Sequence, residues 1–141
     1  MPFLSRLTIG ICVASLAVIG LLFLGLFGGE RSQPIDRAYV LQAAGLLVFF
    51  SFPYLAVILL ARARTASRRR GGTLFGIGTL ICAVGVAAFA FDAYSYHTAT
   101  GDEKLYYQGF VPQFMAAIVQ YALLANLTFS TRDPRPHPGG R

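Results

Sequence analysis

The sequence predicts an all-α integral membrane protein, an up-down bundle of four transmembrane helices with both termini in the cytoplasm. Four apolar runs predict the helices, at about residues 7–27, 38–61, 73–91 and 110–129. Each run is close to the roughly 20 residues that a helix needs to cross a hydrocarbon core about 30 Å thick. Hydrophobic residues make up 55% of the chain and charged residues only 13%, against about a quarter in soluble domains. This composition excludes a soluble fold.

The charges between the apolar runs predict the orientation. The N-terminus, the second connection and the C-terminal tail together hold nine Lys and Arg and one acid, whereas the other two connections hold three basic and five acidic residues. Because positively charged segments resist translocation, we expect the first group in the cytoplasm. The arginines of Arg62–Arg70 are expected to contact anionic lipid headgroups. Lipid contact explains the basic pI near 9.8, and we expect no nucleic-acid partner.

The chain is expected to form one transmembrane domain over residues 1–131, followed by a disordered basic tail at 132–141 that is rich in Pro and Gly. The first apolar run is longer than the core of a cleaved signal peptide, and no A-x-A site follows it. We therefore expect it to remain as the first helix. The Arg-, Ala- and Gly-rich composition favours a bacterial inner membrane.

Small residues form stripes on the first and third predicted helices. Such stripes let helix backbones approach closely, and close packing drives helix association in a bilayer. They predict contacts with other helices, either inside the bundle or between subunits. The stripes contain Gly10, Ala14 and Ala17 in the first helix, and Gly72, Gly76, Gly78, Cys82 and Gly85 in the third.

The second predicted helix contains Pro53, which lacks a backbone N–H and clashes with the preceding turn, so we expect a kink at residues 49–53. A neighbouring group or the Ser51 hydroxyl is expected to satisfy the carbonyl that the proline leaves free. The aromatic residues around Pro53 either line a cavity for a hydrophobic ligand or pack as ordinary core and lipid-facing residues.

Uncharged amides are among the polar groups inside the predicted helices. Gln113 and Gln120 share a face of the fourth helix. A buried amide is costly without a hydrogen bond, so Gln120 is expected to point into the bundle. It forms either an interhelical hydrogen bond, worth about 1 kcal/mol, or an anchor for a lipid or quinone headgroup. In the second case the ligand-binding residues are Gln42, Pro53, Tyr54, Gln113 and Gln120.

The segment after the third run contains polar residues that are expected to form a solvated outer rim, namely Asp92, His97, Asp102 and Glu103. A cation-binding or pH-sensing cluster is the alternative. None of the four runs contains Asp, Glu, Lys or Arg, which argues against a proton-coupled carrier.

Cys12 and Cys82 lie outside any C-x-x-C motif and outside the outer connections, so we expect them to be packing residues rather than a redox pair. The two histidines, His97 and His137, are predicted on opposite sides of the membrane and cannot meet within one subunit. Since a metal or haem site needs several converging donors, we expect neither a metal nor a cofactor.

The small-residue stripes and the lack of a catalytic constellation predict a non-catalytic accessory or structural subunit. It would pack in a larger membrane complex or a homo-oligomer, so its expected partners are lipids, other membrane subunits or further copies of itself. A lipid or small hydrophobic ligand binding or transport protein is the alternative. An enzyme working at the outer interface through the rim residues is a third, weaker possibility.

Overall fold

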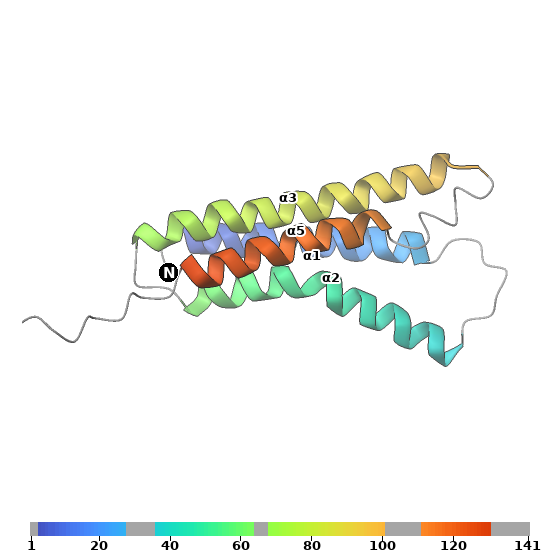
Figure 1. The fold of residues 1–141 in the computed structure, drawn as a ribbon, viewed down its shortest axis with the longest axis horizontal. Coiled ribbons are helices and arrows are strands. Elements are labelled where there is room, and N and C mark those ends of the chain that lie inside the picture. Colours follow the sequence, from blue (N-terminus) through green and yellow to red (C-terminus); the bar gives the residue numbers. More distant parts are fainter. Residues whose placement is uncertain (1–2, 28–35, 64–67, 101–110, 131–141) are drawn as a thin grey trace, which may run out of the picture.

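The computed structural model describes residues 3–27, 36–63, 68–100 and 111–130, and this part of the chain forms four long helices (Figure 1). They are α1 (Phe3–Phe27), α2 (Arg37–Ala63), α3 (Arg68–Thr98) and α5 (Val111–Ser130). Each is long and apolar enough to cross a membrane. The prediction of an all-helical chain is therefore confirmed for the described residues, and so is the prediction of four helices that are long and apolar enough to span a membrane.

The helices alternate in direction along the chain (Figure 1). α3 packs most extensively against α1 and α5, α1 also packs against α2, and α2 makes smaller contacts with α3 and α5. One apolar cluster lies between them, in which Ile19, Val57, Ile81 and Leu127 are completely buried. The chain therefore has a packed interior formed by all four helices.

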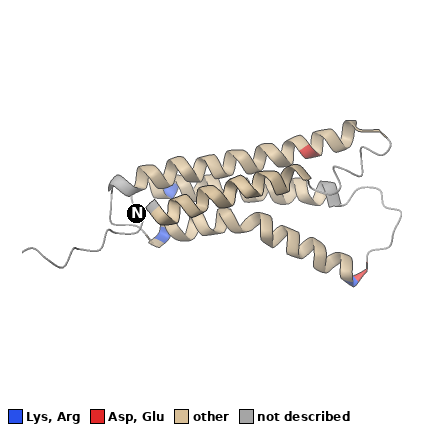
Figure 2. Cartoon of the chain, in the orientation of Figure 1, with Lys and Arg blue, Asp and Glu red and all other residues tan. Residues whose placement is uncertain are grey.

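Charged residues lie towards the ends of the described helices (Figure 2). Arg6 near the start of α1 and Arg62 near the end of α2 lie at one end of the bundle, which we call the Arg6 end. Asp92 lies towards the opposite end, called the Asp92 end, where α1 and α3 finish and α2 and α5 begin. The two ends are thus distinct in charge within the described residues.

The third helix differs most from its predicted limits. It begins at Arg68 rather than residue 73, and it continues past residue 91 to Thr98. No Gly or Pro follows residue 91 until the helix has ended, and the Thr98 hydroxyl bonds the Tyr94 carbonyl at 3.0 Å in the last turn. Hydropathy falls at the first charged residue, whereas the backbone stays helical, so Asp92 is part of the helix.

The α2 helix bends near its middle (Figure 1), where Pro53 lies inside it. Since Pro53 has no N–H, the carbonyl of Phe49 loses its helical donor. The hydroxyl of Tyr121, on α5, donates a hydrogen bond to that carbonyl at 2.9 Å. The kink lies where the sequence predicts it, and a neighbouring helix supplies the missing donor.

Several residues named in the sequence analysis lie outside the described residues. They are residues 64–67 of the basic connection, Asp102 and Glu103 of the predicted rim, and the tail at 132–141.

Candidate functional site

A line of small and polar side chains follows the buried face of α1. Its members recur every three or four residues, as positions on one face of a helix do, and all are buried: Ser5, Thr8, Cys12 and Ser15. The small-residue stripe predicted from the sequence, Gly10, Ala14 and Ala17, is exposed and does not pack inside the bundle, so its contact with another chain stays a prediction. The buried face could be predicted from its polar residues, because polar side chains inside a bilayer turn towards the interior of the bundle.

A hydrogen-bonded cluster links three helices at the centre of the bundle. Gln120, on α5, is buried, and its Nε2 donates to the Tyr54 hydroxyl of α2 and to the Ile81 carbonyl of α3, each at 2.8 Å. Both hydrogens of the amide are therefore used within the protein. The cluster fits against Gly85, where an added Cβ would overlap the Tyr54 hydroxyl and the Gln120 amide. This geometry favours the interhelical role of Gln120 over the ligand-anchoring role.

Cys12 and Cys82 lie side by side in the interior, with their sulfur atoms 3.5 Å apart. Both are buried free thiols, one on α1 and one on α3. Both belong to the buried core, but the sequence did not place them together, because it does not fix the relative depth of two helices that are far apart in the chain. The 3.5 Å separation is that of two thiols in contact and not of a disulfide, in which the sulfur atoms lie about 2.0 Å apart.

Asp92 and Gln113 form a second polar cluster near the Asp92 end. Asp92 is 0% exposed, and neither carboxylate oxygen has a hydrogen-bond partner within the described residues. The prediction of a solvated rim is therefore wrong for Asp92, because α3 continues past it and its side chain is buried. His97, on the next turns of α3, is exposed. Gln113 is also buried, and its Nε2 donates to the Ala88 carbonyl of α3 at 3.1 Å.

The small-residue stripe of α3 divides between two faces. Its inner residues, Gly78, Cys82 and Gly85, contact other helices of the same chain. A Cβ added at Gly78 would lie 3.0 Å from Val57. Gly72 and Gly76 are instead exposed, with open space where a Cβ would stand. The inner residues therefore pack within the bundle, and contact of the outward residues with another chain stays a prediction.

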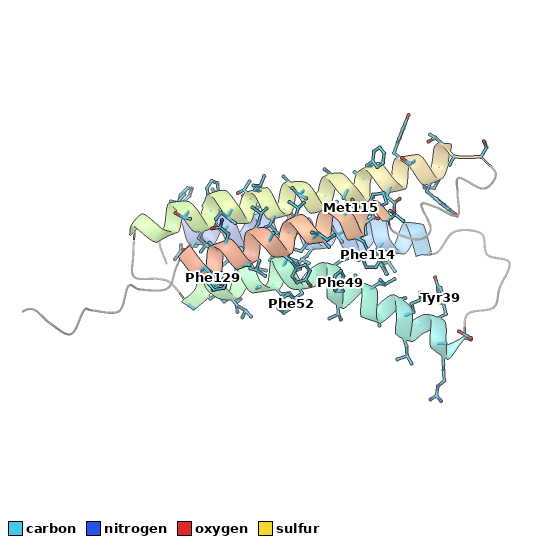
Figure 3. The ribbon with its side chains drawn as sticks, viewed as in Figure 1. Tyr39, Phe49, Phe52, Phe114, Met115 and Phe129 are labelled. Atoms are coloured by element: carbon cyan, nitrogen blue, oxygen red, sulfur yellow. The ribbon has the colours of Figure 1, made fainter. Side chains whose placement is uncertain are left out.

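The first half of α2 diverges from the other helices. None of the residues 37–49, which we call the α2 arm, is buried. The second half of the same helix is packed, with buried Phe50, Pro53, Tyr54, Val57 and Ala61. Figure 3 shows Tyr39 well apart from Phe114 and Met115 of α5. The arm is therefore an apolar helix with little cover from its own chain.

Aromatic rings pack where the arm leaves the bundle. The Phe50 ring lies 5.5 Å from Phe89 and 5.3 Å from Phe114, between ring centroids, and Phe49 stacks on Tyr121 at 5.3 Å. Figure 3 shows Phe49 close to Phe114 at this point. These contacts anchor the kink, which favours ordinary packing over a ligand cavity for the aromatic residues.

Among the described residues, no three His, Cys, Asp or Glu side chains come together in a way that could hold a metal ion. Comparison with models of known protein families, with curated proteins and with solved structures finds no match to this chain.

Proposed function

We propose that this protein is a non-catalytic subunit of a membrane assembly, and that its α2 arm packs against a transmembrane helix of another chain. One observation supports this most directly: the arm has no buried residue, although the rest of the same helix is packed. A helix that is continuous across Pro53 but packed over only half its length leaves a surface for a second chain.

The polarity of the arm supports a protein partner over lipid alone. Gln42 is exposed within an otherwise apolar stretch of the arm. An amide is costly in hydrocarbon unless it is hydrogen-bonded, and lipid tails provide neither donors nor acceptors. A partner helix with a polar side chain or an accessible carbonyl would satisfy the amide. Gln42 is thus the residue expected to contribute most to partner choice.

Small residues on the arm favour close approach by a helix. Ala38, Ala44 and Gly45 are all exposed, and nothing lies within 4 Å of the position of a Cβ at Gly45. Without large side chains, two backbones approach closely and gain dispersion energy along their length. The exposed glycines of α3 at 72 and 76 provide a second surface of the same kind.

The alternative of a lipid or hydrophobic ligand site has less support. Its central residues, Gln120 and Tyr54, bond each other inside the bundle, so a ligand would have to displace that hydrogen bond. Gln42 lies on the diverging arm rather than beside them. Gln42 is thus separated from the bonded pair of Gln120 and Tyr54.

The same proposal places the protein in a bacterial inner membrane with the Arg6 end in the cytoplasm. The charge distribution supports this, because nine of the twelve Lys and Arg residues lie on the segments connected to that end. Positively charged segments stay on the cytoplasmic side, where they also meet anionic headgroups.

Photo-crosslinking in the native membrane tests the interface. A benzoylphenylalanine at Leu41, on the arm and 73% exposed, is expected to form a protein adduct on irradiation. The matched control is Leu21 of α1, which is 71% exposed and also lies in the half of the bundle towards the Asp92 end. We expect the control to give far less protein adduct, because it faces lipid.

The mass of the adduct distinguishes the possible assemblies. A mass equal to two copies of the chain would assign the arm to self-association, and a different mass would assign it to a second protein. Both results support an interface on the arm. Equal yields of protein adduct at the two positions, or only lipid adducts at Leu41, would contradict the proposal.

A further inference from the structure

A buried carboxyl group without a partner lies near the Asp92 end, and the proposed assembly does not use it. Asp92 is fully buried, and both of its oxygens lack a hydrogen-bond partner among the described residues. Twenty-one residues separate it from Gly71 at the start of the apolar span, which corresponds to about 31 Å at 1.5 Å per residue. Asp92 therefore lies close to the boundary of a hydrocarbon core about 30 Å thick.

Gln113 adds a third acceptor to the same place. Its Nε2 donates to the Ala88 carbonyl at 3.1 Å, and in a regular helix that carbonyl also accepts the N–H of residue 92, four positions later. The amide thus lies one turn below Asp92. Its Oε1 is buried and has no hydrogen-bond partner in the described part of the chain. Three acceptor oxygens are therefore buried together, and none of them has a hydrogen-bond partner among the described residues.

The helices around this cluster provide no compensating cation within the described residues. Arg6, the one described cation of α1, lies at the other end of the bundle, and α5 contains no charged residue. Arg37 lies exposed at the tip of the α2 arm, close to Asp36 and Tyr39. On α3, His97 is exposed, and its ring packs against Tyr96 at 5.5 Å.

We propose that Asp92 and Gln113 form a binding site for a single proton that enters from the Asp92 end. The proton binds one carboxylate oxygen of Asp92, which then donates a hydrogen bond to Oε1 of Gln113. One proton thereby removes the buried negative charge and satisfies two of the three acceptors. Nothing else is consumed or released, because the reaction is the association of a carboxylate with a proton.

The number of oxygens favours a proton over a metal ion. Hard cations in proteins take about six to eight oxygen ligands, whereas Asp92 and Gln113 supply three. Ser95 lies one turn further along α3 and is buried, and its single hydroxyl leaves the set below six. A proton needs only one donor–acceptor pair, and the two side chains provide it.

Infrared spectroscopy of the protein in phosphatidylcholine and phosphatidylglycerol vesicles tests the site. A protonated carboxyl group gives a C=O stretching band that a carboxylate lacks. We expect this band in the wild-type protein in mildly acidic, sodium-free buffer. It should disappear in Asp92→Asn and move to higher frequency in Gln113→Leu, where the hydrogen bond from the carboxyl group is lost.

The control is Asp36→Asn, which changes an exposed carboxyl group whose Oδ1 accepts the Tyr39 N–H at the start of α2. Asn caps a helix as well as Asp does, so this variant should fold and keep the band. Absence of the band from the wild-type protein, or its persistence in Asp92→Asn, would overturn the proposal. Loss of the band on adding sodium at constant pH would also overturn it, because the site would then bind a metal cation.

Discussion

At the scale of single residues, Gly85 is the position where the central cluster depends most on a missing side chain. A Cβ at this position would overlap the Tyr54 hydroxyl and the Gln120 amide, and these groups are bonded to each other. We expect Gly85→Ala to lower the free energy of unfolding by about 1–3 kcal/mol, as other overpacked sites do. Denaturation in mixed micelles, followed by circular dichroism, measures the change.

Gly76→Ala is the matched control, because Gly76 lies on the same helix and faces open space. We expect this variant to be as stable as the wild-type chain or slightly more stable, since Ala has the higher helix propensity. Similar losses of stability in the two variants would show that the helix responds to the loss of any glycine. The explanation based on the Tyr54 and Gln120 contact would then be wrong.

The sequence indicates some of these residue contacts but not others. The interior hydrogen bond of Gln120 follows from the cost of a buried amide in hydrocarbon, and the structure contains it. The contact between Cys12 and Cys82 does not follow, because it depends on the relative depth of two helices that are far apart in sequence. The sequence predicts Asp92 on a solvated rim, because the first charge after an apolar run resembles the end of a helix, whereas the structure buries this residue.

At the scale of elements, the kinked helix α2 is held by a hydrogen bond from another helix. The Tyr121 hydroxyl bonds the Phe49 carbonyl that Pro53 leaves without its helical donor. We expect Tyr121→Phe to lower stability by about 1 kcal/mol, a typical value for a hydrogen bond between membrane helices. Equilibrium unfolding in mixed micelles gives this value.

A double-mutant cycle with Pro53→Ala shows whether the hydroxyl acts through that carbonyl. An alanine at position 53 restores the backbone N–H, which bonds the Phe49 carbonyl within the helix. The loss caused by Tyr121→Phe should then shrink towards zero. An equal loss in both backgrounds would contradict the assigned role of the hydroxyl group.

The positions of the four helices and the kink are largely predictable from sequence, because span length and proline chemistry are local properties. The direction in which α2 diverges is not predictable in this way. It depends on which neighbour satisfies Phe49 and on the aromatic contacts of Phe50 with α3 and α5. Long-range contacts of this kind leave no periodic signal in the chain.

At the scale of the whole molecule, the proposed orientation has a direct consequence for labelling. In a Cys12→Ala and Cys82→Ala background, His97→Cys should react with a membrane-impermeant maleimide added to intact spheroplasts, because residue 97 is exposed at the Asp92 end. Arg62→Cys, which is exposed at the Arg6 end, should react only after permeabilisation. The opposite labelling pattern would show that the orientation is the reverse of the one proposed.

The assembly itself is the central claim, and native mass spectrometry after purification in mild detergent tests it most directly. We expect the wild-type chain as a stable complex with another membrane protein or with a second copy. The complex should be largely lost in Gln42→Leu, while Gln42→Asn, which keeps the amide, should retain more of it. A lone chain accompanied only by lipid, for the wild-type protein and both variants alike, would contradict the claim.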